Sequence, residues 1–174
     1  TMFAADAILW FENLDGAGSF GPPQRVAMAD INGPKGVATG DMDGDDDVDV
    51  VVALNLDHEI AWFANIDGAG MFSGKRVLPS LTQGVEVVAL ADVDGDTYID
   101  VVFASYSDDK VGWFRNTDGA GAFASHTVVV ASDGAAAVVA ADVDNDGNID
   151  IVYGGYWDNT VAWVRNTGGG TFGG

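Results

Sequence analysis

The chain has 174 residues, of which 48% are apolar, 27 are acidic, 7 are Lys or Arg and none is Cys. This length and apolar content suit one folded domain with a hydrophobic core, and they exclude a disordered acidic tail. The net charge of −20 disfavours nucleic acid and anionic membranes as partners, the lack of Cys excludes disulfides and thiol catalysis, and no apolar run is long enough for membrane insertion.

Residues 1–40 contain the first copy of a segment that returns along the chain. It starts as Trp10-Phe-Glu-Asn and continues through Asp-Gly-Ala-Gly to a Phe. Further copies start at Trp62, Trp113 and Trp163. Aromatic residues favour strands and the Gly-rich segment favours a tight turn, so each full copy predicts a hairpin of two strands. Residues 2–5 are the candidate for a shortened strand that precedes the first hairpin.

The other expected strands differ in composition, and this indicates where they lie. Small residues dominate the stretches at 36–40, 85–91 and 135–141, as expected for strands crowded near a central axis. The segments at 20–26, 72–78 and 123–130 contain Pro, Lys, Arg or His, which are typical of an outer edge strand.

Three Asp-rich loops of nine residues follow the small-residue strands. They occupy residues 41–49, 92–100 and 142–150, at spacings of 51 and 50 residues, and are called the first, second and third Asp loops. Each has Asp at positions 1, 3, 5 and 9, and four carboxylates brought together repel one another unless a cation lies among them. Calcium suits such a loop because it takes about six to eight hard oxygen ligands with loose geometry.

The predicted ligands of up to three calcium ions are the four carboxylates of each loop and the backbone carbonyl at its position 7. They are Asp41, Asp43, Asp45, Asp47 and Asp49 in the first loop, Asp92, Asp94, Asp96, Tyr98 and Asp100 in the second, and Asp142, Asp144, Asp146, Asn148 and Asp150 in the third. An EF-hand fits poorly because position 12 is Val52, Phe103 or Tyr153 instead of Glu. The alternative without metal is a set of acidic, solvated turns.

A strand that is apolar on both faces follows each Asp loop, and this predicts cover by neighbouring sheets on both sides. A polar turn then leads to the strand with the Trp-Phe pair, whose rings would fill the space between sheets. Four antiparallel strands per unit of about 50 residues describe a blade of a β-propeller. The chain therefore reads as one all-β domain, residues 1–174, with two complete repeats (41–91 and 92–141) and two partial ones (1–40 and 142–174).

The pattern Asp-x-Asp-x-Asp-x-x-x-Asp, an apolar strand and Trp-Phe-x-Asn resembles the FG-GAP/VCBS family of calcium-binding propeller repeats, found in the heads of integrin α chains. The resemblance implies the Asp residues at positions 1, 3, 5 and 9 as metal ligands. The chain departs from the family pattern at position 6, where Gly occurs only as Gly147 while Asp46 and Thr97 replace it in the other loops. Gly44 and Gly95 lie two residues earlier, and the Phe-Gly and Gly-Ala-Pro signature is missing.

The last repeat stops where its fourth strand should run, and we expect an exposed strand edge there to recruit strands from elsewhere. We therefore expect assembly with copies of the chain, as a ring or a filament, or with further repeats. A compact ring of four blades within one chain and a piece excised from a longer array are the alternatives.

No catalytic constellation is visible, because His58 and His126 fall in different parts of their repeats. We expect a non-enzymatic, calcium-stabilised structural or adhesive module outside the cell or at its surface, where calcium is abundant. Its partners would be copies of itself, other proteins or glycans. A lectin is the first alternative, with Tyr106, Tyr156 and Trp157 as sugar-binding candidates, and a part of a polysaccharide-active enzyme is the second.

Overall fold

The computed structural model describes residues 6–27, 30–79 and 82–173. Within these ranges the regular structure consists of β-strands, which pair antiparallel, and this confirms the predicted all-β class. The candidate strand at residues 2–5 lies outside the described residues. No helix in the described ranges has the length and apolar character that a membrane span requires.

The strands form three four-stranded sheets and one two-stranded sheet, each a simple meander in chain order. The two-stranded sheet contains β1 (Ile8–Trp10) and β2 (Gln24–Ala27). The next contains β3 (Pro34–Gly40), β4 (Asp49–Leu54), β5 (Glu59–Phe63) and β6 (Arg76–Val77). The third contains β7 (Val85–Ala91), β8 (Asp100–Ser105), β9 (Lys110–Phe114) and β10 (Thr127–Ala131). The last contains β11 (Ala135–Ala141), β12 (Asp150–Gly155), β13 (Thr160–Asn166) and β14 (Phe172–Gly173).

The sheets are offset from the sequence repeats, because each four-stranded sheet begins with the strand before its Asp loop. The last sheet therefore takes β11 from the preceding repeat, and β1–β2 matches the third and fourth strands of the other sheets. The expectation that the last unit lacks a fourth strand is wrong. The two-residue strand β14 pairs with β13, through Arg165 with Gly173 and Asn166 with Phe172.

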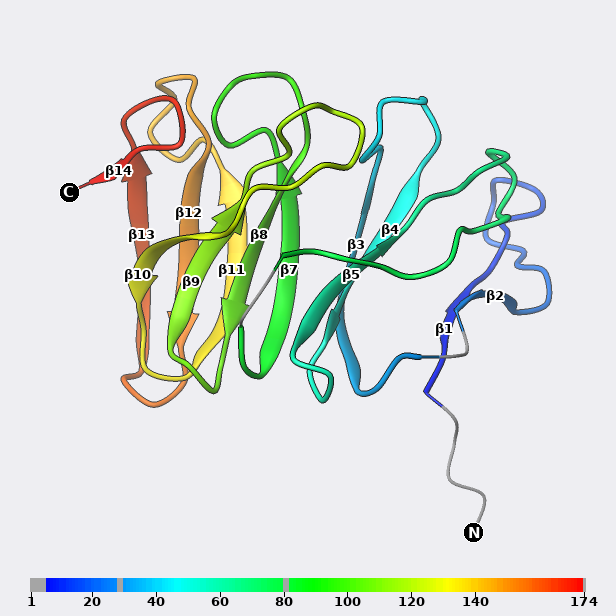
Figure 1. The fold of residues 1–174 in the computed structure, drawn as a ribbon, viewed down its shortest axis with the longest axis horizontal. Helices are drawn as coiled ribbons and strands as arrows, with labels where there is room; N and C mark the ends of the chain where they lie inside the picture. The colour runs from blue at the N-terminus through cyan, green and yellow to red at the C-terminus, as the bar shows by residue number, and fades with distance from the viewer. Residues whose placement is uncertain (1–5, 28–29, 80–81, 174) are drawn as a thin grey trace, which may run out of the picture.

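The four sheets stand side by side in chain order, with β1–β2 and β11–β14 at opposite sides of the molecule (Figure 1). The described strands do not close into a ring. The inner strand β7 packs against both β3 and β11. This region is crowded as predicted, since a Cβ on Gly36 would lie 2.6 Å from the carbonyl oxygen of Glu86.

The hydrophobic core lies between the sheets in three layers. Every residue of β4 and β8 is buried, which confirms that the strand after each of the first two Asp loops is covered on both faces. Successive residues of a strand point to opposite faces. Trp62 accordingly packs in the layer toward β7–β10, whereas Phe63 packs in the layer toward β1–β2.

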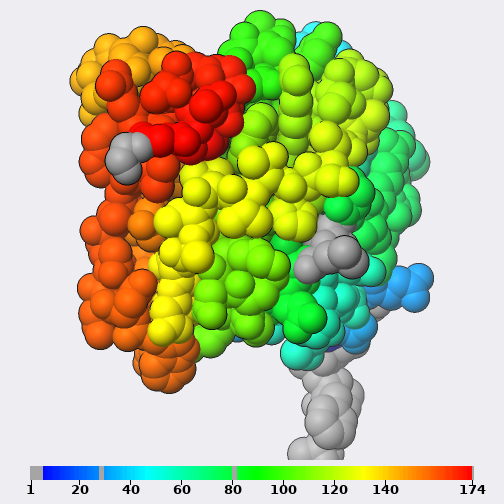
Figure 2. Space-filling view, turned by 60° about the vertical axis from the view of Figure 1, so that its left-hand side comes forward, coloured from blue at the N-terminus to red at the C-terminus, as the bar shows by residue number. Residues whose placement is uncertain are grey.

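The outer strands are short and exposed, as their composition predicts. Both residues of β6 are exposed, and no residue of β10 is fully buried. Figure 2 shows β10 (yellow) lying across the surface beside the last sheet (orange to red). The predicted turns before these strands are also present, since Asn65 bridges Phe72 and Asn116 bridges Phe123 around the Gly-rich segments.

Candidate metal centre

Each Asp loop brings three carboxylates together at positions 1, 3 and 5. One carboxylate oxygen from each of the three residues lies within 4.8 Å of the other two. The three groups are Asp41, Asp43 and Asp45; Asp92, Asp94 and Asp96; and Asp142, Asp144 and Asp146. Such groups of hard oxygen atoms fit a calcium ion better than a soft or nitrogen-preferring metal.

The first Asp of each loop shapes the backbone around the group. In the second loop, Asp92 Oδ1 accepts hydrogen bonds from the N–H groups of Gly95 at 2.8 Å and Asp96 at 3.0 Å. Its Oδ2 accepts from the N–H of Thr97 at 2.8 Å. Asp41 makes the equivalent bonds, so its carboxylate holds the first loop in the same conformation.

Positions 4 and 6 of every loop have a positive φ, which only Gly adopts without strain. Gly44 and Asp46 have φ of 77° and 69°, and the third loop has 60° at Asn145 and 91° at Gly147. Each loop therefore places one Gly and one other residue in these two positions. The replacement of Gly at position 6 of the first two loops therefore does not change the backbone conformation of these loops. Thr97, with φ of 78°, is however a β-branched residue in a strained conformation.

The Asp at position 9 lies beneath the group and joins the loop to the hairpin that follows. Asp100 is fully buried, with Oδ2 accepting from the N–H of Val93 at 2.9 Å and Oδ1 from the N–H of Asn116 at 2.8 Å. Asp49 and Asp150 are buried and bonded in the same way. A carboxylate oxygen that accepts one N–H keeps a second lone pair, so the ligand role of these residues stays a prediction.

The position-7 residues lie beside the group through their backbone. In each loop the N–H at position 7 donates to Oδ1 of the Asp at position 5. The pairs are Asp47 with Asp45 at 2.9 Å, Tyr98 with Asp96 at 3.0 Å and Asn148 with Asp146 at 2.9 Å. These bonds fix the carboxylate at position 5. The use of the position-7 carbonyl as a ligand also remains a prediction.

The loops also connect neighbouring sheets. Nδ2 of Asn116 donates to the carbonyl of Met42, the second residue of the preceding Asp loop, at 3.0 Å. Nδ2 of Asn166 donates to the carbonyl of Val93 at 2.7 Å. The Asn of the repeated Trp-Phe segment therefore joins its own sheet to the loop before it, a role that the repeat pattern alone did not indicate.

The electrostatics of the first two loops favour a cation. Burial raises the pKa of Asp100 to about 7. Burial, together with the neighbouring carboxylates, also raises the pKa of Asp43, Asp49 and Asp94. Oδ1 of Asp43 is buried and has no hydrogen-bond partner among the residues that the structure describes. An unpartnered buried carboxylate oxygen beside two other carboxylates fits a metal ligand.

Two arginines that the sequence analysis did not single out bind the second and third loops. Nε and Nη2 of Arg115 lie 2.6 Å from Asp94 Oδ2 and 2.9 Å from Asp96 Oδ2. Arg165 makes the same pair of contacts at 2.7 and 2.8 Å in the third loop. Both arginines stand directly before the Asn in a copy of Trp-x-x-Asn, and this shared position was the sequence signal that could have pointed to them. In the first loop the nearest such contact within the described ranges is 3.9 Å, from Arg76 Nη1 to Asp43 Oδ2.

The model of the FG-GAP-like repeat matches residues 41–103 and 92–153, which together span all three Asp loops. The chain belongs to this family. No curated protein matches the chain. The two FG-GAP-like matches overlap at the second loop, so each match runs from one Asp loop to the strand after the next.

The other candidate residues lie outside the Asp loops. His58 Nδ1 accepts a hydrogen bond from the N–H of Gly84 at 3.0 Å, whereas His126 lies against the rings of Phe103 and Phe114. The rings of Tyr106, Tyr156 and Trp157 form one cluster across two neighbouring turns, with centroids 4.8 to 6.3 Å apart. Tyr156 and Trp157 are 62% and 61% exposed.

Proposed function

We propose that this FG-GAP-like chain is a non-enzymatic, calcium-stabilised module with a structural or adhesive role outside the cell. The observation that carries the proposal is the convergence of three carboxylates in each Asp loop, with Asp43 Oδ1 of the first loop buried and without a hydrogen-bond partner in the described part of the chain. Extracellular calcium is concentrated enough to fill even weak loops of this kind.

Calcium would act by stabilising the folded arrangement of the sheets. The residues that would hold it are the carboxylates at positions 1, 3 and 5, with the Asp at position 9 and the position-7 carbonyl as further ligands. The same loops hold the hairpins through Asp100 and join neighbouring sheets through Asn116 and Asn166. A cation that binds only the folded loops contributes about 2.7 kcal/mol per site at a hundredfold excess over its Kd.

We further propose that the sheets are blades of a β-propeller that is completed by copies of the chain or by further repeats. The outward side of the last sheet supports this proposal. Val161 and Trp163 are 84% and 43% exposed, whereas Ile60 and Trp62, at the same positions of the β3–β6 sheet, are 0% and 2% exposed. A face that is core in one sheet and open in another suits a further sheet packed against it.

Thermal unfolding tests the calcium role. We expect the melting temperature of protein freed of metal with EGTA to rise when calcium is added, and magnesium at equal concentration to have a smaller effect because it requires stricter octahedral geometry. An unchanged melting temperature after complete metal removal would show that the loops are not stabilising sites. Light scattering with and without calcium then tests assembly.

Carbohydrate binding is a second candidate, which the exposed ring cluster favours. The rings of Tyr156 and Trp157 meet edge to face, and both residues line a cavity of about 620 Å³ together with Gly154 and Val161. Exposed aromatic rings beside polar turn residues suit sugar recognition. A glycan array with the wild-type chain and with Tyr156→Ala and Trp157→Ala tests this candidate, and binding that both substitutions leave unchanged would reject it.

A further inference from the structure

The three Asp loops, which connect β3 to β4, β7 to β8 and β11 to β12, lie at the same end of the molecule (Figure 1). A cavity of about 140 Å³ lies between the first loop and the second, and Asp41, Gly44, Thr97 and Asn116 are among the residues that line it. Asn116 follows β9, so a side chain of the third sheet reaches the first loop directly.

The residue at position 2 of the first two loops is held from both sides. Its N–H donates to the position-9 Asp of its own loop, from Met42 to Asp49 Oδ2 and from Val93 to Asp100 Oδ2, both at 2.9 Å. Its side chain is buried between sheets, with Met42 and Val93 1% and 2% exposed. Its carbonyl accepts from the Asn of the following sheet. A shift of the backbone at position 2 therefore displaces groups in both sheets.

The Asn of the following sheet is bonded to its own Asp loop as well. Nδ2 of Asn116 also donates to the carbonyl of Ile99 at 3.3 Å, and its N–H donates to Asp100 Oδ1 at 2.8 Å. Asn116 therefore contacts positions 8 and 9 of the second loop, and Asn166 contacts the same positions of the third. The two Asn residues are 1% and 0% exposed, so water does not compete for these bonds.

These bonds form one continuous path through the three loops. Each step is a hydrogen bond of 2.7 to 3.0 Å. In order, the path runs through Asp49, Met42, Asn116, Asp100, Val93, Asn166 and Asp150. Every loop contributes its position-9 Asp, so the path touches each of the three carboxylate groups.

We propose that the three Asp loops bind calcium cooperatively, and that Asn116 and Asn166 are the positioning residues that couple them. The inference rests on the proposed function, because it takes the loops as calcium sites. Without a cation the carboxylates at positions 1 and 3 repel each other, and position 2 lies between them. Calcium at the first loop fixes the Met42 carbonyl, and Asn116 with it. The second loop then loses less conformational entropy when it binds an ion.

Electrostatic repulsion between bound ions acts in the opposite direction. The first loop contains six aspartates and the second four, so each keeps a net negative charge after it takes one calcium ion. Salt at about 0.15 M screens charges that are more than about 8 Å apart in exposed loops. This repulsion is present with and without the Asn116 contact, so a comparison of the two cases isolates the coupling.

Calcium titration followed by NMR resolves the three loops in a chain of 18.0 kDa. The reporters are the N–H groups that donate to the first Asp of each loop, from Gly44, Gly95 and Gly147. Each signal gives the calcium concentration that half-fills its own loop. Coupling appears as a change at one loop when another loop is disabled.

The decisive comparison disables the first loop with Asp43→Asn. The second loop should still bind calcium, but its half-filling concentration should rise about fivefold or more. Asn116→Asp keeps the acceptor for the N–H of Gly119 and removes the donor to the Met42 carbonyl. In a chain with Asn116→Asp, the addition of Asp43→Asn should change the half-filling concentration of the second loop by less than about twofold.

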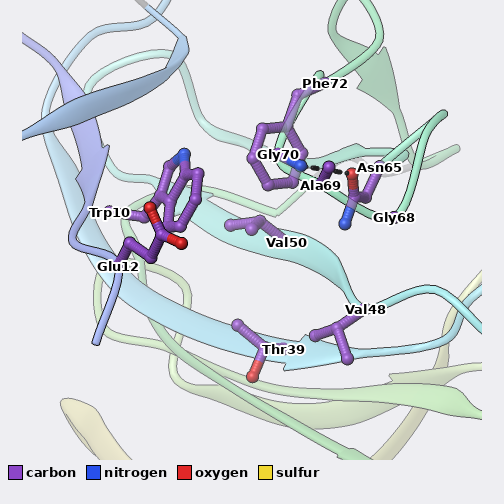
Figure 3. Close-up of a pocket in the computed structure, with 10 residues that line it drawn as sticks. All are labelled: Trp10, Glu12, Thr39, Val48, Val50, Asn65, Gly68, Ala69, Gly70 and Phe72. Carbon is purple, nitrogen blue, oxygen red and sulfur yellow. Dashed lines mark hydrogen bonds between the residues drawn. The ribbon is translucent and has the colours of Figure 1, made fainter. Parts of the chain in front are cut away.

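Asn65→Asp is the matched control. Asn65 holds the same position in the β3–β6 sheet, where its Oδ1 accepts from the N–H of Gly70 at 3.0 Å (Figure 3). Its Nδ2 donates to no Asp loop among the described residues. Asn65→Asp adds the same carboxyl group as Asn116→Asp, but it should leave the effect of Asp43→Asn on the second loop unchanged.

A second measurement keeps Asn116 in place, so it does not depend on how well Asn116→Asp folds. In Asp94→Asn, whose second loop is disabled, calcium at the first loop should slow hydrogen exchange at the side-chain amide of Asn116. The reason is that the bound ion fixes the Met42 carbonyl that this amide contacts.

An equal effect of Asp43→Asn with and without the Asn116 contact would overturn the coupling. An Asn116 exchange rate that calcium leaves unchanged would overturn it as well, as would independent filling of the three loops in the wild-type chain. Failure of the proposed function is distinguishable from these outcomes, because no loop would then show saturable binding.

Discussion

The first and third Asp loops share a backbone conformation and differ in how their charge is balanced. Both have positive φ at positions 4 and 6 and a buried Asp at position 9. The first loop contains six aspartates, and its nearest arginine contact is 3.9 Å long. The third contains four aspartates and is bound by both Nε and Nη2 of Arg165. The backbone therefore brings the carboxylates together in both loops. The cation that neutralises them is set independently, and in the third loop it is Arg165.

The pKa values of the two loops follow this difference. Burial and neighbouring carboxylates raise the pKa of Asp43 in the first loop. In the third loop, hydrogen bonds from the N–H of Asn148 and from Arg165 lower the pKa of Asp146. We infer that the first loop depends more on calcium than the third.

The largest effect is expected where the two loops are alike. Asp49→Ala and Asp150→Ala each leave two backbone N–H groups without their acceptor, so both should lower the free energy of unfolding by about 2–4 kcal/mol. Urea unfolding in EGTA measures this cost without the metal. A cost below about 1 kcal/mol in either variant would show that position 9 does not hold the loop.

The pH dependence of stability should reverse with calcium. Burial raises the pKa of Asp100 to about 7, above its ordinary value of about 3.9. Between these values the folded state holds a proton that the unfolded state has released, so stability in EGTA should fall as the pH rises from about 4 to 7. Asp43, Asp49 and Asp94 act in the same direction, and bound calcium would oppose it by favouring the ionised carboxylates.

Melting curves from pH 4.5 to 7.5, with EGTA and with calcium, measure this prediction. Asp15 does not interfere, because hydrogen bonds from Ser19 and the N–H of Ala17 lower its pKa to about 2 and place its effect below this window. His126 acts in the opposite direction within the window, because burial lowers its pKa below 6.5, but it contributes equally with and without calcium. The same pH dependence of stability in EGTA and in calcium would therefore contradict the proposed charge repulsion in the loops.

Removal of an arginine should increase the dependence on calcium. Arg165→Gln should destabilise the metal-free chain only slightly, since the ion pair is half-exposed and screened by solvent, and should increase the stabilisation that calcium adds. Arg25→Gln, an exposed arginine on β2, is the matched control and should change neither quantity. If calcium stabilises Arg165→Gln by the same amount as the wild-type chain, Arg165 does not reduce the dependence of the third loop on calcium.

The smallest effect concerns backbone strain. Thr97 has φ of 78°, so Thr97→Gly should stabilise the chain by up to about 1 kcal/mol, after the entropic cost of Gly in the unfolded state. Gly147→Thr reverses the exchange in the third loop and should destabilise it by a similar amount. Chemical unfolding measures both, and destabilisation by Thr97→Gly would indicate a contact of the Thr side chain that outweighs the strain.

The strands and the carboxylate groups could be predicted because both depend on local spacing. The alternation of small, apolar, aromatic and polar strands gives the order within each sheet, and the Asp spacing alone brings positions 1, 3 and 5 together. The predicted repeat bounds are offset from the sheets only because they were counted from the Asp loops, since the predicted strand order already begins each sheet with the small-residue strand before its loop. β11 belongs with β12 because the Asp loop between them is a hairpin connection, whereas a repeat boundary is only a choice of where counting begins.

Contacts between residues far apart in the chain were the other part beyond the sequence. Arg115 reaches Asp96 across 19 residues, and Asn116 reaches Met42 across 74 residues in the neighbouring sheet. The arginine contact was signalled only by the shared position of the two arginines in their repeats, whereas the Asn116 contact depends on how neighbouring sheets pack, and a single sequence carries no signal of it. The same reason applies to the ring cluster, where Tyr106 meets Trp157 only because two turns are adjacent.

Direct calcium binding tests the central claim. Isothermal titration of the EGTA-treated, dialysed chain should show saturable binding of up to three ions, and Asp43→Asn should remove the binding at the first loop while leaving the others. A titration without saturable binding at millimolar calcium would contradict the account, because the three carboxylate groups would then be acidic turns without a metal.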